Sequence, residues 1–148
     1  MNTVQHKTPK VSVGWREWVA LPDLGIDRVK AKIDTGARTS CLHTFKIEEF
    51  DQNGEAWVRF WVHPHQGDDE THVQAEAKVL ARRIVRDSGG HEQLRYVIQT
   101  TLQAGKLRYP IEMTLTARDN MRFRMLLGRT AMAGQMTVDP MHSFLLGK

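Results

Sequence analysis

The strand-like runs of this chain are short, and each one soon ends at residues that favour a turn. Runs of alternating apolar and polar residues recur roughly every 8–12 residues, separated by glycine, proline, asparagine or aspartate. The clearest run, WVRFWV, places Val58, Phe60 and Val62 on one face. This rhythm predicts an all-β protein, either a barrel or a sandwich.

Further strands and hairpins follow from the same pattern. Asn53-Gly54 and residues 103–106 predict hairpin turns. Residues 73–86 are ambiguous, because AEAKVLARR favours a helix whereas VLARRIV suits a strand. The remaining strands are expected at 14–21, 26–33, 39–50, 94–102, 107–116 and 122–127.

Length and composition indicate one ordinary globular domain. The chain has 148 residues, and we expect a flexible N-terminal arm over 1–12 followed by a single domain over 13–148. Its single cysteine, Cys41, cannot form an intramolecular disulfide. The chain has no apolar run long enough to span a membrane, and MNTVQHKTPK lacks the apolar stretch of a signal peptide. These features predict a cytoplasmic protein without a membrane partner.

The charge balance favours acidic partners without specifying them. A net charge of +4 raises the question of nucleic acid. However, the basic residues are scattered among acidic ones, and no interleaved aromatic residues accompany them. Trp15 and Trp18 are expected in the core or at a dimer interface. The sequence therefore argues against a nucleic-acid partner.

The segment with the clearest chemical signal is VKAKIDTGA, residues 29–37. A strand delivers Asp34 into a turn, and Gly36 follows where the backbone must approach another group closely. Taken alone, the segment supports two interpretations. Asp34 is either a catalytic carboxylate or an aspartate that caps its own turn.

A second segment, RFRMLLGR at 122–129, favours the catalytic interpretation of Asp34. Together the two segments resemble the retropepsin-like aspartic proteases, which pair a hydrophobic-Asp-Thr-Gly-Ala turn with a later hydrophobic-hydrophobic-Gly-Arg strand. The resemblance implies an all-β closed barrel with one short C-terminal helix. Residues 130–135 would supply this helix, and residues 143–146 a final strand.

Two longer stretches narrow the resemblance to one bacterial group. GWREWVALPDLGIDRVKAKIDTGARTSCLH and TLTARDNMRFRMLLGRTAM resemble the RimB-like family, also called ATP-dependent zinc proteases. The similarity covers about residues 13–146. Members often accompany RimK-type ligases, which add glutamate to a ribosomal protein. The chain has no GxxxxGK[ST] phosphate loop, so ATP binding is not expected.

The resemblance implies a role for each residue of the two motifs. Asp34 would be the catalytic carboxylate, and Thr35, Gly36 and Ala37 would complete the active-site loop. An aspartic peptidase needs two carboxylates that share one proton. One Asp-Thr-Gly per chain therefore implies a homodimer, acting as an endopeptidase on a peptide or protein substrate.

The supporting residues follow in the same way. Gly128 would leave room behind the turn, and Arg129 would orient the C-terminal helix through salt bridges. Asp87-Ser88-Gly89 is disfavoured as an internal second site, because Arg86 stands where a buried apolar residue is expected. The glycine-rich turn at 86–93 is instead the expected flap, and its substrate-binding residues would be Ser88, Gly89 and Gly90.

Arg38 is a departure from the viral pattern, which has an aspartate there to pair with the arginine at position 129. Arg129 then needs another carboxylate, and Asp139 is the expected partner. Arg38 is assigned to substrate binding, where it would attract a carboxylate-rich substrate such as a glutamylated ribosomal protein.

Other functions remain open at this point. One alternative is a non-catalytic binding or regulatory module that partners a RimK-type ligase or its ribosomal substrate. Another is a metal-dependent hydrolase that uses His63, His65 and His72, although the chain has no HExxH motif. Aspartic catalysis is preferred, and it requires no cofactor or metal.

Overall fold

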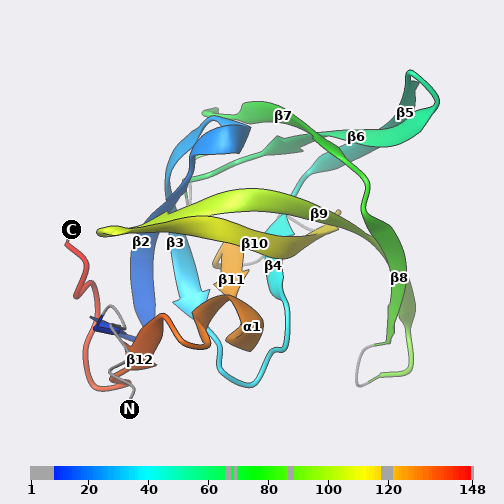
Figure 1. Cartoon of the computed structure of the whole chain (residues 1–148). Helices are drawn as coiled ribbons and strands as arrows, with labels where there is room; N and C mark the ends of the chain where they lie inside the picture. The colour runs from blue at the N-terminus through cyan, green and yellow to red at the C-terminus, as the bar shows by residue number, and fades with distance from the viewer. Residues whose placement is uncertain (1–8, 66–67, 69, 87–88, 118–121, 148) are drawn as a thin grey trace, which may run out of the picture.

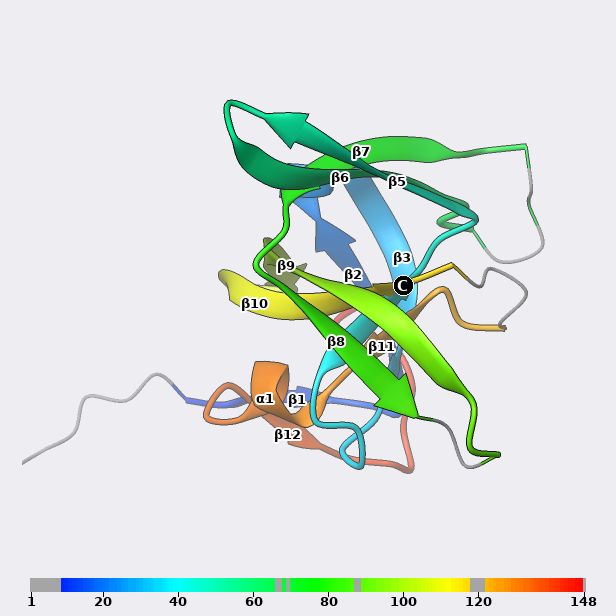
Figure 2. The ribbon, with the colours of Figure 1, turned by 90° about the vertical axis from the view of Figure 1, so that its right-hand side faces the viewer.

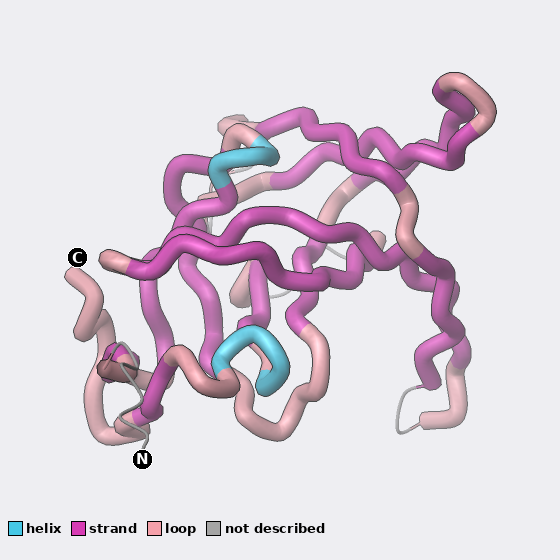
Figure 3. Tube along the Cα trace, viewed as in Figure 1, coloured by secondary structure: helices cyan, strands magenta, loops and turns pink. Residues whose placement is uncertain are grey.

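The structure, a computed structural model, describes residues 9–65, 68, 70–86, 89–117 and 122–147. Strands dominate it, with a 3-10 turn η1 and a single short α-helix within the described ranges (Figure 3). No helix among the described residues is long and apolar enough to cross a bilayer. The elements are β1 (Val11–Val13), β2 (Arg16–Leu21), η1 (Pro22–Leu24), β3 (Ile26–Ile33), β4 (Ser40–His43), β5 (Lys46–Gln52), β6 (Glu55–Val62), β7 (Val73–Lys78), β8 (Ala81–Arg86), β9 (Glu92–Ala104), β10 (Leu107–Thr116), β11 (Met125–Leu127), α1 (Arg129–Met132) and β12 (Met136–Val138).

Six of these strands form a closed ring around the main core. The order is β10-β4-β11-β3-β2-β9, and β9 pairs with β10 to close it. β8 extends β9 outward as a hairpin, away from the ring (Figure 1). The closed, all-β architecture with one short α-helix is the one the sequence predicts.

Alternation along the strands decides which residues fill the ring. In β3, Val29, Ala31 and Ile33 point inward and are buried, while the basic residues between them point outward. The separate sheet β5-β6-β7 lies over the ring (Figure 1). It contributes Phe60, which is fully buried, to the same hydrophobic cluster.

The predicted strand at 39–50 is wrong as a single element, because the chain changes sheets in the middle of it. The Thr44 N–H donates to Thr116 O of β10, whereas the next N–H, of Phe45, donates to Trp61 O of β6. β4 therefore belongs to the ring and β5 to the covering sheet. The Asn-Gly hairpin between β5 and β6 is confirmed, with φ of 53° at Asn53 and 82° at Gly54.

The ambiguous stretch at 73–86 forms two strands and no helix. β7 pairs with β6, and β8 pairs with β9. Between them, the Val79 N–H bonds to Ala56 O and the Leu80 N–H to Val97 O, so the chain returns from the covering sheet to the ring. Partner strands thus override the helical propensity of AEAKVLARR.

The chain ends differ from expectation. The predicted strand at 143–146 is absent, and the last strand is β12, which pairs in parallel with β1. β1 begins at Val11, so two residues assigned to the N-terminal arm belong to this small sheet. The predicted strand at 122–127 is also shorter, because only β11 pairs with β3 and β4.

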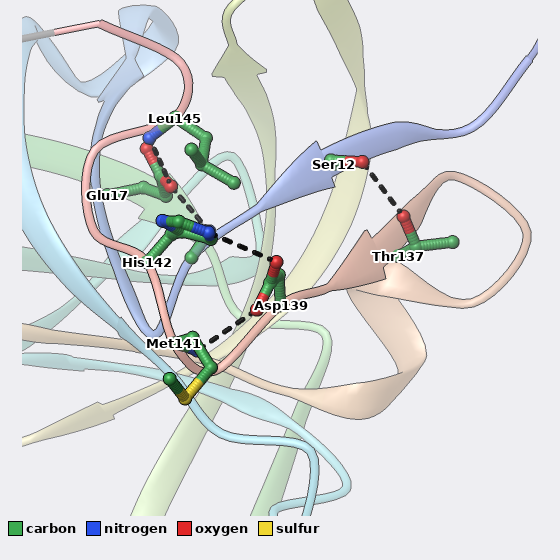
Figure 4. A network of polar contacts seen from close by, with 8 residues as sticks. Ser12, Glu17, Thr137, Asp139, Met141, His142 and Leu145 are labelled. Carbon is green, nitrogen blue, oxygen red and sulfur yellow. Dashed lines mark hydrogen bonds and ion pairs between the residues drawn. The ribbon is translucent and has the colours of Figure 1, made fainter.

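A buried carboxylate fastens the C-terminal segment to β2. Glu17 has no exposed surface and accepts the N–H of Leu145 at 2.8 Å (Figure 4). It also accepts the N–H of Gly14 at 2.6 Å and that of Leu146 at 3.0 Å. Two of these bonds provide the backbone N–H groups of residues 145 and 146 with a side-chain acceptor. Their N–H groups are therefore not paired with a neighbouring strand, which explains why the apolar residues near the end of the chain do not form a strand.

Candidate active site

Asp34 lies at the point where β3 leaves the ring. β3 runs parallel to β11, and the Asp34 N–H continues this pairing by donating to Leu127 O at 2.9 Å. On the other side, the Ile33 N–H donates to Trp15 O. The backbone at Ile33 and Asp34 is therefore held by β11 on one side and by Trp15, just before β2, on the other, so the half-buried Asp34 side chain projects from a fixed position.

The turn after Asp34 is organised by the Asp34 carboxylate itself. Its Oδ1 accepts the N–H of Gly36 at 3.0 Å and the N–H of Ala37 at 3.2 Å. Among the described residues, Oδ2 has no hydrogen-bond partner. The two interpretations from the sequence are thus compatible, because one oxygen caps the turn while the other remains available for chemistry.

Helix α1 braces the same loop from behind. The Arg129 N–H donates to Ala37 O at 2.7 Å, and Thr130 donates to Arg38 O through both its N–H and its hydroxyl. The loop 34–38 is therefore fixed at its start by strands and at its end by the first residues of the helix. Such support limits how far the carboxylate can drift from a productive geometry.

Gly128 is packed too closely for any side chain. A Cβ there would lie 2.6 Å from Thr39 C and 2.8 Å from Thr39 O, both backbone atoms. Its N–H also donates to Ser40 Oγ at 2.9 Å. The glycine lets β11 press against the segment that follows the active-site loop.

We expect Gly128→Ala to lower the free energy of unfolding by about 3 kcal/mol, because the added methyl forces backbone to move. Urea denaturation would measure this loss. Gly54→Ala is a suitable control, since φ is positive there but nothing lies within 4 Å, and about 1 kcal/mol is expected. Equal losses in the two variants would contradict the close-packing argument.

The expected ion pair between Arg129 and Asp139 is not present. The guanidinium of Arg129 instead donates from Nη1 to Thr35 O, at 3.4 Å. Asp139 lies 3.5 Å from His142 Nε2 and accepts the Met141 N–H (Figure 4). Over the described ranges, Arg129 forms no ion pair, so its contact with the active-site loop runs through a carbonyl rather than a carboxylate.

Arg38 lines a cavity of about 480 Å³ beside the loop. Arg83 of β8 lines the same cavity and lies 3.3 Å from Glu112 of β10. Tyr109 donates its hydroxyl to Ala131 O, and burial raises the pKa of Tyr109 to about 12. Sequence reasoning missed Arg83 and Tyr109, because no local motif marks them and only strand packing brings them to Arg38.

The expected flap corresponds to the β8–β9 hairpin. Both views show the end of β8 at the same end of the molecule as the loop that follows β3 (Figures 1 and 2). Gly89 and Gly90 are exposed, and Gly90 has φ of 83°. Ser88 and Asp87 lie outside the described residues. The paired positions Ile84 and Leu94 are also exposed on this hairpin.

Among the described residues, the three candidate zinc ligands do not form a metal site, because His63 and His72 line one pocket with Phe45 but His65 does not join them there. The Phe45 ring lies 4.0 Å from the ring of His63 and 6.3 Å from the ring of His72, centre to centre, and so packs against both. No group of three or more metal-ligating side chains gathers within the described part of the chain. The residues present therefore do not fit a zinc site, although residue 69 of this loop lies outside the described set.

A closed ring with an Asp-Thr-Gly turn braced by a Leu-Leu-Gly-Arg strand defines the retropepsin-like class. The family model described as RimB-like, retropepsin-like aspartic endopeptidase RimB, matches residues 12–148. The chain belongs to this family.

Two kinds of relative extend the comparison. A probable alpha-L-glutamate ligase of Shewanella pealeana is 45% identical over 139 residues, and one of Parasynechococcus marenigrum is 47% identical over 140. These matches cover 94% and 95% of this chain but 30% of each relative, so the chain spans about a third of their length. A crystal structure of a Legionella pneumophila protein of unknown function (DUF785) has a TM-score of 0.74 and 26% identity, covering 93% of this chain and 99% of that one.

Proposed function

We propose that the protein is an aspartic endopeptidase that acts as a homodimer. The observation that carries this proposal is the geometry at Asp34, whose Oδ1 is held by two backbone N–H groups while Oδ2 has no partner among the described residues. We expect it to work in the cytoplasm, since a chain with one cysteine has no need of an oxidising compartment.

The chemistry requires a second Asp34 from a partner copy. Two carboxylates a few ångströms apart cannot both ionise, so they share one proton. The ionised member removes a proton from water, which attacks the peptide carbonyl, while the protonated member polarises the carbonyl oxygen. Thr35 would join the two loops at the dimer axis, and the exposed backbone at Gly36 would contact the substrate.

A carboxylate-rich peptide, such as the glutamate tail of a modified ribosomal protein, is the substrate we propose. Arg38 and Arg83 line one cavity beside the active-site loop, and arginine binds carboxylates through paired, charge-assisted hydrogen bonds. Two relatives carry the name of a glutamate ligase. A peptidase that removes what such a ligase adds would use these arginines to hold the tail.

We expect Arg38→Ala to raise KM for a glutamate-tailed peptide about tenfold while changing kcat little, because the lost contact binds substrate and does not touch the reacting atoms. Mass spectrometry of the products would give both constants. The matched control is the same peptide with glutamine in the tail. If the two peptides are cleaved equally well, Arg38 does not select acidic substrates.

A second function, a binding module for a glutamate ligase, is favoured by one observation. In the relatives named as ligases, a segment similar to this chain makes up about a third of a longer protein. Joining two activities in one chain suits domains that work on one substrate or dock together. If this is the function, the Asp34 carboxylate only stabilises the turn that follows it, and ligase binding does not depend on Asp34.

A metal-dependent hydrolase is not proposed. His63 and His72 are each packed against the Phe45 ring, and no third ligand joins them within the described residues.

A further inference from the structure

The outward face of β2 and β3 concentrates positive charge. Arg16 and Trp18 point outward from β2, and Arg28, Lys30 and Lys32 from β3. We call these side chains, with the aromatic rings that pack on them, the β2–β3 platform. It lies on the flank where the C-terminal end of the chain runs (Figure 1).

The register places like charges opposite each other. Arg16 pairs with Lys32 across the two strands, and Trp18 pairs with Lys30. Like charges directly opposite on a sheet are destabilising. Burial lowers the pKa of the Lys30 ammonium, and the charges of Arg16 and Arg122 lower it further. The face therefore holds repulsion that a bound anion would relieve.

Aromatic rings are interleaved with these cations. The Arg28 guanidinium lies 4.1 Å from the ring centre of Trp18, and that of Arg16 lies 4.6 Å from Trp15 and 4.8 Å from Phe144. Trp18 and Phe144 are stacked, with their planes 18° apart. All three rings are half-buried, so part of each remains exposed.

Phe123 adds a fourth aromatic ring to this surface. It meets Trp15 edge-on at 5.9 Å, and the Lys30 ammonium lies 5.5 Å from its ring. Segments far apart in the sequence thus supply one surface. The platform is the stacking arrangement whose absence from the linear sequence argued against nucleic acid.

Some basic residues elsewhere in the molecule are paired with carboxylates, unlike the cations of β3. Arg59 is paired with Glu76 at 2.6 Å, and Lys78 with Glu55 at 2.7 Å. By contrast, no carboxylate of the described residues lies within 4 Å of Arg28, Lys30 or Lys32. The β3 cations of the platform therefore carry charge that no carboxylate of the described residues compensates.

We propose that the β2–β3 platform binds single-stranded nucleic acid. Its cations match a phosphate backbone, and its rings and guanidinium planes offer stacking surfaces for bases. A carboxylate-rich peptide fits less well, because the negative face of an aromatic ring gives a carboxylate no attraction. The proposal does not rest on the peptidase function, since neither Asp34 nor the cavity at Arg38 takes part.

Fluorescence anisotropy with a labelled single-stranded RNA of about twelve nucleotides would test it, a length that one small domain can cover. We expect the triple variant R28Q/K30Q/K32Q to bind at least tenfold more weakly and to reduce the slope of log K against log salt by about two. Trp18→Leu, which keeps an apolar side chain, should weaken binding about tenfold through lost stacking. Thermal unfolding would verify that each variant is folded.

The matched control is K46Q/R59Q/K78Q, which removes the same charge from the β5-β6-β7 sheet and should leave RNA affinity within about twofold. The proposal is overturned if the wild type does not bind the RNA at low salt, or if the control variant weakens binding as much as the platform variant. It is also overturned if an oligoglutamate peptide binds the platform as tightly as RNA and Trp18→Leu has no effect, because the face would then serve an acidic protein.

Discussion

Asp34→Asn is expected to reduce cleavage of a glutamate-tailed peptide by at least about a thousandfold, because an amide can neither take a proton from water nor share one with its partner. The fold should survive. The asparagine Oδ1 can still accept the N–H groups of Gly36 and Ala37 that organise the turn. Turnover measured from about pH 4 to 8, with circular dichroism and a measurement of dimerisation on both proteins, would establish this.

Asp51→Asn is the matched control for this experiment. Asp51 also caps its own turn, accepting the Gly54 N–H at 3.4 Å, but it does so on the β5–β6 hairpin. The Asp51→Asn variant loses the same charge as Asp34→Asn, and its turnover should equal that of the wild type. If Asp34→Asn cleaves as fast as the wild type, the aspartic mechanism is wrong. If neither the wild type nor Asp34→Asn cleaves the peptide but both bind a glutamate ligase equally, the binding module is the correct function.

Glu17→Ala is expected to lower the free energy of unfolding by about 4 kcal/mol, the largest effect we predict on stability. The change strips three backbone N–H groups of a charged acceptor in a site with no exposure to water, and it leaves a cavity. Glu17→Gln should lower the free energy of unfolding by about half as much. The glutamine oxygen keeps some of the hydrogen bonds, whereas its NH2 group faces a backbone N–H, which is also a donor. Urea denaturation would measure both losses.

Hydrogen exchange would show where the loss acts. The amides of Leu145 and Leu146 should both exchange faster in Glu17→Ala, since both lose their acceptor, whereas in Glu17→Gln only one of the two should do so. Glu55→Gln is the control, because Glu55 is half exposed in a surface pair with Lys78 and should change stability by no more than about 0.5 kcal/mol. A loss of less than about 1 kcal/mol in Glu17→Ala would mean that the C-terminal segment is held by other contacts.

Local patterns were sufficient for much of the fold. The strand at 26–33 is confirmed at both ends, because its alternation faces one core and Gly25 and Asp34 interrupt it. The Asn53-Gly54 hairpin is confirmed because the turn residues themselves set its geometry. The position of Asp34 in a turn after that strand could be predicted for the same reason.

Other features of the structure cannot be predicted from any single segment of the sequence. The sheet switch at residues 44 and 45 depends on acceptors in β10 and β6, which are distant in the chain. The C-terminal segment avoids a strand because Glu17, more than a hundred residues earlier, supplies its acceptors. The pairing of Arg129 with Thr35 O could not be predicted, since a carbonyl leaves no mark in the sequence.

The all-β class, the main turns and the segment that carries Asp34 can be predicted from the chain alone, because each rests on contacts between near neighbours. The closure of the ring, the lining of the Arg38 cavity and the contacts between the β3 cations and aromatic rings become visible only in the folded molecule. These features join groups that are distant in the chain, and the distances between them are set only when the ring forms.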